Sequence, residues 1–230
     1  RVQNSNSTFQ DMTPLEFVKS GAGNCGSGPD MLLVGWSDGL FQAINADNGA
    51  IVWQHQTEVN SWGITGSLLV EDESVTIPTR RGVDKLCLDG SMGFSYETGL
   101  GWRNGVTLAG ESYWVGDEEG NLWSVTSKGA TKHFIASGKI RHAPVTLPSE
   151  NLVIHLQTDT GSTIYHFNTT SAQSSIVVTS GYSPGMPITI GDYVITTDSQ
   201  YLRSISCEVE CVVKDSESVS YTHLRAHETI

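Results

Sequence analysis

The chain has few basic residues and no long apolar run. Among its 230 residues, 13 are Lys or Arg and 25 are Asp or Glu, which gives a formal net charge of −12. Nucleic-acid binders meet phosphate with basic surface, and anionic membranes attract basic segments, so the composition argues against both partners. No stretch approaches the ~20 apolar residues of a membrane-spanning helix, and we expect no membrane insertion.

Signatures of catalysis are also missing. No nucleophile with a nearby base, phosphate-binding glycine loop or cluster of metal ligands stands out. The glycines of residues 21–26 have the wrong spacing for a dinucleotide-binding loop, and no strand precedes them. We therefore expect no catalytic residue, no metal and no cofactor.

Turn signals and short apolar runs dominate instead. Within residues 31–57, the runs 32–35 and 40–44 flank Ser37-Asp38-Gly39, and a second turn at residues 45–49 leads to Ile51-Val52-Trp53. Such tight turns between short apolar runs are typical of antiparallel hairpins. The stretch predicts a meander of strands.

The same arrangement recurs along the chain. Turn-like pairs end at residues 39, 82, 120, 161 and 200, at intervals close to 40 residues. An apolar residue follows each pair at a similar distance, and these landmarks are Trp53, Phe94, Phe134, Ile176 and Val213. Four short strands per 40 residues is the pattern of a β-propeller, and evenly spaced hairpins of a β-sandwich are the alternative.

Residues 43–53, AINADNGAIVW, resemble the repeat of the PQQ-like (BamB-like) β-propeller family, A-x-D-x-x-T-G-x-x-x-W. Asn45 and Asn48 depart from its preferred Asp and Thr, but both can hydrogen-bond a turn. The resemblance implies an all-β fold of four-stranded antiparallel blades. Because that family usually has seven or eight blades, the five units seen here imply an incomplete ring.

The predicted organisation has three parts. Residues 1–30 read as an irregular lead-in that could supply one strand to the first blade, and the start at Arg1 leads us to expect further residues upstream. The blades are expected at residues 31–57, 62–98, 104–137, 143–180 and 186–216. Residues 217–230 read as a non-native tail.

The tail is distinctive in its own right. Residues 219–229, VSYTHLRAHET, look like translated sequencing-adapter read-through and match no propeller strand. His223 and His227 have the i, i+4 spacing of helical zinc ligands, but the read-through explains them without a metal.

Two of the four cysteines flank a turn. Cys207 and Cys211 would face each other across a hairpin, where a disulfide can form, although a metal site or two free thiols remain alternatives. A disulfide would imply an oxidising compartment. Cys25 and Cys87 cannot be paired from the sequence, and we expect Cys87 to be a small core residue.

Loop geometry yields the candidate site. In a four-stranded blade, the turn between the second and third strands and the link to the next blade emerge on one face. The residues expected to form a binding face there are Trp62, Arg80, Arg81, Trp102, Arg103, Arg141 and His142. Aromatic and arginine enrichment is typical of binding hot spots, and solvated turn residues are the competing interpretation.

Three functions compete on this evidence. The resemblance implies a noncatalytic extracytoplasmic scaffold, periplasmic, at the cell surface or secreted, that binds a protein or other partner. The alternative is a fragment of a PQQ-dependent dehydrogenase, but those enzymes carry an adjacent Cys-Cys pair and this chain has none. A sensor or adhesion module of a larger secreted protein differs from the first only in its partner.

Overall fold

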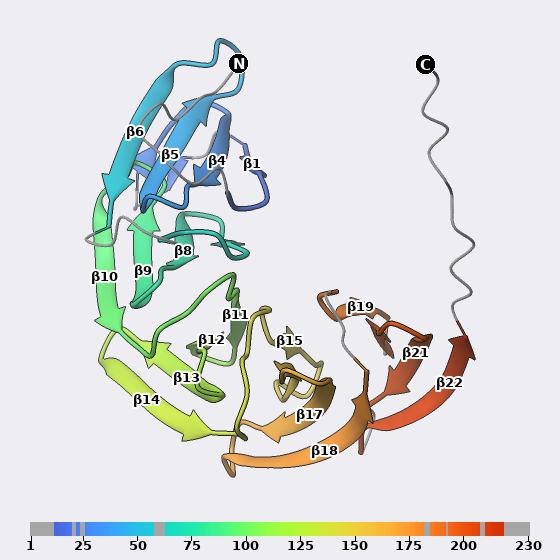
Figure 1. The fold of residues 1–230 in the computed structure, drawn as a ribbon. Coiled ribbons are helices and arrows are strands. Elements are labelled where there is room, and N and C mark those ends of the chain that lie inside the picture. The colour runs from blue at the N-terminus through green and yellow to red at the C-terminus, as the bar shows by residue number, and fades with distance from the viewer. Residues whose placement is uncertain are drawn as a thin grey trace, which may run out of the picture.

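The computed structural model describes residues 12–19, 22–23, 26–57, 63–181, 185–191, 193–207 and 210–218. These residues form five four-stranded antiparallel sheets and one two-stranded sheet, and none of them is helical. Figure 1 shows the five sheets following one another along an arc, with a gap between the first and the last. The predicted all-β propeller and its incomplete ring are therefore confirmed.

Each sheet is one blade, numbered here from 1 to 5 in chain order. Blade 1 contains β1 (Glu16–Val18), β4 (Met31–Gly35), β5 (Leu40–Asn45) and β6 (Ile51–Gln56), while β2 (Ala22–Gly23) and β3 (Gly26–Ser27) form the separate hairpin. Blade 2 contains β7 (Leu69–Val70), β8 (Ser74–Pro78), β9 (Gly82–Cys87) and β10 (Met92–Glu97). Blade 3 contains β11 (Val106–Ala109), β12 (Ser112–Gly116), β13 (Asn121–Thr126) and β14 (Gly129–Phe134).

The remaining two blades repeat this order. Blade 4 contains β15 (Val145–Thr146), β16 (Leu152–Gln157), β17 (Ser162–Asn168) and β18 (Gln173–Ser180). Blade 5 contains β19 (Ile188–Ile190), β20 (Tyr193–Thr197), β21 (Tyr201–Ser206) and β22 (Val212–Ser218). The first strand of each blade lies toward the centre of the arc, and the fourth lies on its rim (Figure 1).

The lead-in and the tail differ from the simple division into three parts. Blade 1 takes its inner strand β1 from the lead-in, where Phe17 pairs with Leu32 of β4. At the other end, β22 continues to Ser218. The predicted read-through, residues 219–230, lies outside the described residues.

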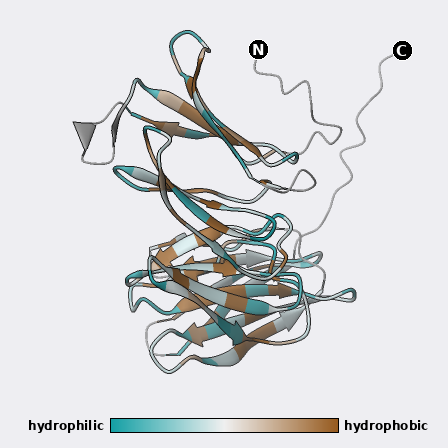
Figure 2. Cartoon of the chain, turned by 90° about the vertical axis from the view of Figure 1, so that its left-hand side faces the viewer, coloured by the Kyte–Doolittle hydropathy of each residue, from teal (hydrophilic) through white to brown (hydrophobic). Residues whose placement is uncertain are grey.

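The core lies between neighbouring blades. Leu33 and Phe41 of blade 1 pack with Ile77 and Leu86 of blade 2, and similar clusters fill the three following interfaces. Figure 2 shows brown, hydrophobic stretches on the strands and teal at several loops. Each fully buried aliphatic side chain contributes roughly 1.5–3 kcal/mol, so stacking of blades supplies most of the stabilisation.

The predicted landmarks do not all occupy equivalent positions. Trp53 pairs with Ala43 and Phe94 pairs with Lys85, at matching places in blades 1 and 2. Phe134 pairs with Asn121 at the far end of its blade and is 65% exposed. Ile176, at 64%, and Val213 are exposed too, so the landmark register was wrong beyond blade 2.

The cause is the changing length of the turn before the outer strand. In blade 3, Thr126 pairs directly with Gly129, which leaves a two-residue turn at residues 127–128. In blade 1, Ile44 pairs with Ile51 across a longer loop. Equal spacing in the sequence therefore places side chains at different points along the outer strand.

Candidate functional site

Turns and interblade links are hydrogen-bonded to one another on a single face. Arg80 of the blade 2 turn donates its N–H to Gly63 O, and Glu118 of the blade 3 turn donates its N–H to Leu100 O, each at 2.8 Å. Gly101 in turn donates to Arg80 O at 2.8 Å. These bonds fix the relative positions of residues that are far apart in the sequence.

Apolar anchors hold two of the links against the preceding blade. Ile140 packs so closely on Gly116 that a Cβ there would lie 2.1 Å from its Cγ2, and Ile64 lies equally close to Gly35, at 2.2 Å. Ile140 N–H also donates to Asp117 O at 2.9 Å. The residue after this anchor, Arg141, is thereby held in place over the centre of the face.

Trp102 is the central side chain of this face. The Arg141 guanidinium carbon lies 4.2 Å from the centroid of its ring, and that of Arg103 lies 5.2 Å away. Both distances are within the ~6 Å range of cation–π attraction. We call Arg80, Leu100, Trp102, Arg103, Glu118 and Arg141 the Trp102 face.

Arg103 adopts an unusual backbone conformation. Its φ is 55°, in the left-handed region that side chains other than glycine rarely occupy. Its N–H donates to Thr65 Oγ1 of the preceding link at 3.3 Å. The strain, of order 1–3 kcal/mol, must be offset by surrounding contacts, and such residues concentrate at functional sites.

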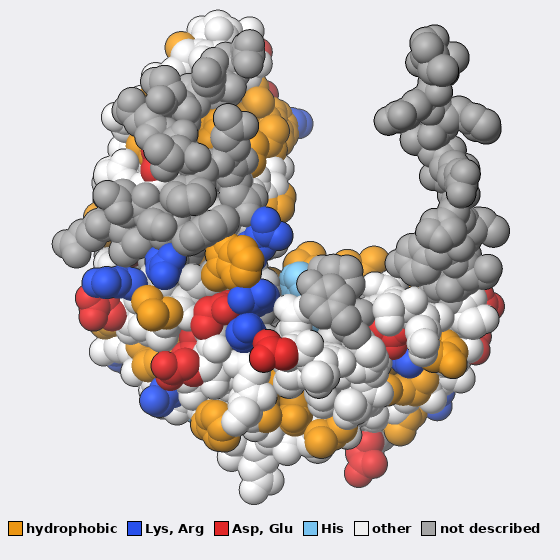
Figure 3. Space-filling model, in the orientation of Figure 1, with side chains coloured by type: hydrophobic (Ala, Val, Ile, Leu, Met, Phe, Trp, Pro, Cys, Tyr) orange, Lys and Arg blue, Asp and Glu red, His pale blue; other side chains and the backbone are white. Residues whose placement is uncertain are grey.

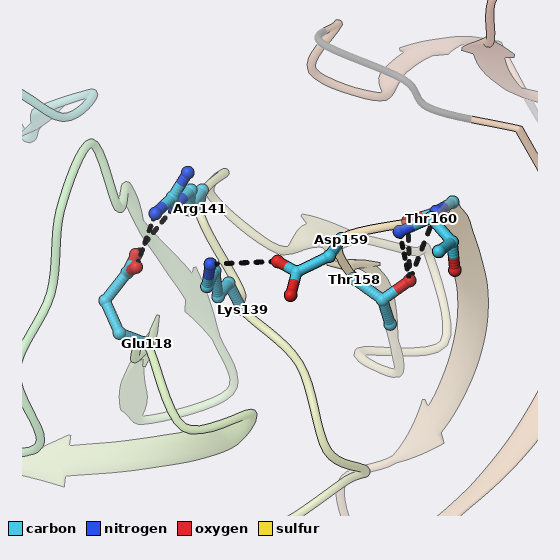
Figure 4. Close-up of polar contacts among 7 residues, drawn as sticks. Glu118, Lys139, Arg141, Thr158, Asp159 and Thr160 are labelled. Atoms are coloured by element: carbon cyan, nitrogen blue, oxygen red, sulfur yellow. Dashed lines mark hydrogen bonds and ion pairs between the residues drawn. The ribbon is translucent and has the colours of Figure 1, made fainter.

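Arg141 is held by a bidentate ion pair. Its Nε donates to Glu118 Oε1 at 2.8 Å, and its second terminal nitrogen donates to Oε2 at 2.6 Å. The two side chains are only 22% and 24% exposed. Figure 4 shows this pair beside a second one, Lys139 with Asp159, whose atoms are 3.4 Å apart. Because Glu118 occupies the guanidinium fork, Arg141 supports the Trp102 ring.

Two cavities flank Glu118. One, of about 320 Å³, is lined by Arg80, Leu100, Gly101, Trp102 and Glu118. The other, of about 460 Å³, lies toward blade 4 and includes Lys139 and Asp159. In Figure 3, charged side chains of both signs surround hydrophobic ones near the middle of the arc. The face can therefore take an apolar group beside charged groups.

A pair of histidines, one buried and one half-buried, lies next to Arg141. The ring centroids of His142 and His155 are 5.1 Å apart. Burial, with a smaller effect from His142, lowers the pKa of His155 to about 4. Burial and then Arg141 lower the pKa of His142. Both rings are therefore neutral at pH 7 and add no charge to the face.

The structure brings most of the predicted binding residues together. Arg80, Trp102, Arg103, Arg141 and His142 form one connected group. Arg81 lines a different cavity, between blades 1 and 2. Trp62 lies outside the described residues.

Sequence reasoning missed three members of the group. Glu118 occupies the same turn position as Arg80, so the repeat could have predicted that it lies on this face. Leu100 is 51% exposed beside Trp102, and a lone leucine in a link carries no sequence signal. His155 lies within the apolar strand β16, which gave no indication of its neighbour.

Disulfides join cysteines at two places. Cys207 and Cys211 are bonded across the turn between β21 and β22. Cys87 is also disulfide-bonded, so the expectation of a plain core thiol was wrong. A residue flanked by Leu86 and Leu88 looks like core in the sequence, and nothing local reveals its partner.

Two further findings concern metal binding and membrane spanning in the described part of the chain. No group of three His, Cys, Asp or Glu residues there could hold a metal ion. Among the same residues, no helix has the length and apolarity needed to cross a membrane.

Comparison with known proteins identifies the fold. No family model matches the sequence, and no curated protein matches it. Among solved structures, BamB from Moraxella catarrhalis is similar with a TM-score of 0.63 and 17% identity, over 88% of this chain and 60% of that one.

Two other similar structures share still fewer identical residues with this chain. The Neurospora crassa Pan2 WD40 domain has a TM-score of 0.60 and 10% identity, over 81% of this chain and 61% of that one. The computationally designed Ika8 protein has a TM-score of 0.60 and 12% identity, over 87% and 60%. The chain thus spans about three-fifths of each of these structures. It has the β-propeller fold, with BamB among its structural neighbours.

Proposed function

We propose that the chain is part of a noncatalytic, extracytoplasmic β-propeller scaffold that binds a protein through the Trp102 face. The observation that carries the proposal is the Trp102 ring, which lies against two guanidinium groups beside a cavity of about 320 Å³. Tryptophan and arginine are the residue types most enriched in binding hot spots.

The face is organised before any partner arrives. Backbone hydrogen bonds tie the links to the turns, and the Glu118 carboxylate holds the Arg141 guanidinium against the ring. Little side-chain entropy remains to be lost at Arg141 and Trp102 on binding, which favours affinity. Arg103 is exposed beside them and can reach outward.

The lining indicates what kind of partner segment fits. Leu100 and Trp102 offer apolar contact, while Arg80 and Arg103 bring positive charge to a protein whose net charge is −12. Arginine recognises carboxylates well because its planar fork donates two parallel hydrogen bonds. A peptide with an apolar side chain next to an Asp or Glu matches this combination.

The disulfides support the extracytoplasmic part of the proposal. Cys207 is bonded to Cys211, and Cys87 is disulfide-bonded as well. Stable disulfides are rare in reducing compartments and common in secreted and periplasmic proteins.

The test selects peptides that bind the wild-type chain from a random display library, after peptides that bind the Trp102→Ala variant have been removed. We expect the enriched peptides to combine an apolar residue with Asp or Glu. Binding should fall at least about tenfold with Trp102→Ala, Arg103→Ala or Arg141→Ala, as for hot-spot residues.

Lys128→Ala is the matched control, because Lys128 is exposed in the turn at residues 127–128. It removes one positive charge away from the Trp102 face and should leave binding unchanged. Equal losses from Lys128→Ala and Arg103→Ala would mean that only net charge matters, and the proposed face would then be wrong.

A further inference from the structure

A further cavity lies between blades 1 and 2, apart from the Trp102 face. It measures about 360 Å³ and opens between the outer strand β6 of blade 1 and strands β9 and β10 of blade 2. That size is within the range of pockets that hold small molecules. We call it the first crevice.

One position of the repeat explains why the cavity exists. A backbone hydrogen bond closes the turn between the second and third strands. The residue two places after its acceptor lies on the side opposite to the following blade, and in blade 3 this residue packs against Phe94 of blade 2. The residues at this position in blades 1, 2, 3 and 5 are Gln42, Asp84, Trp123 and Arg203. In blade 4 it is Thr163, whose Oγ1 lies 3.5 Å from Thr179 Oγ1 of the same blade.

In three of these blades the side chain is tied to its own turn. Gln42 Oε1 accepts from Trp36 Nε1 at 3.0 Å, and Trp123 Nε1 donates to Asp117 Oδ2 at 2.8 Å. Arg203 forms an ion pair with Asp198. Trp123 also packs with Phe94 and so helps to fill the crevice between blades 2 and 3.

Asp84 behaves differently. It is 8% exposed, and it reaches across to blade 1, where its Oδ2 lies 3.1 Å from His55 Nε2. Its Oδ1 accepts a hydrogen bond from Ser95 Oγ at 2.6 Å. A short carboxylate therefore occupies the position that an indole fills in blade 3. The space between the two blades is left open as the first crevice, with polar groups at its base.

The arrangement is not that of a hydrolase. The Asp84 carboxylate lies between Ser95 and His55. His55 is therefore not hydrogen-bonded to Ser95 Oγ, as the general base of a serine hydrolase would be.

The lining selects an uncharged, hydroxyl-rich ligand. Arg81 and Glu97 bring opposite charges, and Gln56, Thr57 and Thr79 add an amide and hydroxyls. A hydroxyl both donates and accepts, so a ligand carrying several can satisfy carboxylate, guanidinium and amide partners together. An ion of either sign would instead meet a like charge. Met92 and Tyr96 supply apolar surface for a ring face.

We propose that the first crevice binds a monosaccharide unit, free or at the end of a glycan. Its ring would occupy the space that the Trp123 indole fills in the next crevice, with hydroxyls directed to Asp84 and His55 at the base and to Arg81 and Glu97 at the mouth. The inference goes beyond the proposed protein-binding function and does not depend on it.

The test is saturation-transfer NMR on the whole chain with glucose, galactose, mannose, fucose and N-acetylglucosamine. At least one sugar should give a signal with the wild type. The signal should fall about tenfold with Asp84→Asn, which keeps the shape but removes the charge-assisted hydrogen bonds. Arg81→Ala and Glu97→Ala, both at exposed positions, should weaken it without affecting the fold.

Lys128→Ala and Trp102→Ala are the controls and should leave the signal unchanged. Absence of a signal from all five sugars with the folded wild type would overturn the proposal. So would a signal that survives all three crevice variants. Loss of the signal with Trp102→Ala would place the sugar on the Trp102 face and equally refute the crevice as its site.

Discussion

His155 shows how the repeat scaffold accommodates an ionisable residue in its core. Its side chain is 3% exposed in β16, and neither ring nitrogen has a hydrogen-bond partner among the residues that the structure describes. A buried imidazole in this setting resists protonation, because the charged form would lose hydration and meet the neighbouring His142 ring. The native state therefore favours the neutral form of His155 over the protonated form.

This predicts a loss of stability in mild acid. The pKa of His155 is lowered from 6.5 to about 4, so the unfolded chain takes up a proton more readily than the folded one. The free energy of unfolding is therefore not reduced by His155 above pH 6.5. It falls as the pH drops toward 4, by about 3 kcal/mol over the whole interval.

Urea denaturation at several pH values measures this effect. His155→Phe keeps a ring against His142 and removes the titrating group, so its free energy of unfolding should fall less between pH 7 and pH 4 than that of the wild type. Carboxylate titration affects both proteins alike. Parallel pH profiles would show that His155 is not responsible.

At the level of single residues, the sequence predicted which side chains lie together in the site better than it predicted what each of them does there. Trp102 and Arg103 were singled out as binding residues, and the structure places them together. Arg141 was expected to belong to the binding face, but Glu118, from the turn of the preceding blade, occupies its guanidinium fork. That pairing joins residues 23 positions apart through the packing of turn against link, which no local pattern encodes.

At the level of elements, turns were more predictable than outer strands. The pairs ending at Gly39, Gly82, Gly120 and Gly161 all lie where the second strand turns into the third, because their spacing follows the blade itself. Outer strands such as β14 lie on the rim, where few apolar contacts constrain the register. Small changes in turn length then displace the apolar landmarks.

The disulfide across the β21–β22 turn should contribute modestly. Cys207 and Cys211 enclose only the residues of one turn. A loop this short loses little denatured-state entropy on closure, so the gain should be below the ~3 kcal/mol expected for a 15-residue loop.

Two measurements check this prediction. Mass spectrometry after alkylation should find neither thiol free in oxidised protein. The double variant Cys207→Ser/Cys211→Ser should then unfold at slightly lower urea concentration than the wild type. Free thiols in oxidised material, or a loss well above 3 kcal/mol, would contradict the expected contribution.

At the level of the whole molecule, the arc of blades determines where the binding face lies and which apolar side remains exposed. The Trp102 face exists because the links and turns of blades 2, 3 and 4 converge on one side of the sheets. Repeat spacing was sufficient to predict that convergence, while the ion pairs and cavities depend on side-chain packing between blades. Closure of the arc is the one global feature that stacking of these blades does not achieve (Figure 1).

An open arc leaves blade 5 with one face that none of the five described blades covers. Val194 faces blade 4, so its strand neighbour Tyr193 points the opposite way, and Ile190 shares that side because it pairs with Tyr193. Tyr193 is 46% exposed, and Ile190 and Ile188 are 60% and 47% exposed. A cluster of this kind resembles the buried side of an interblade interface and favours association.

We expect the isolated chain to self-associate through this side of blade 5. Ile190→Lys should lower the mean mass seen by light scattering, because burying a lysine against an apolar surface is unfavourable. Ile176→Lys is the matched control: Ile176 is 64% exposed, but it lies on β18 at the rim. The same decrease from both variants would trace association to surface hydrophobicity in general, and a wild type that is already monomeric would exclude the open face as a contact.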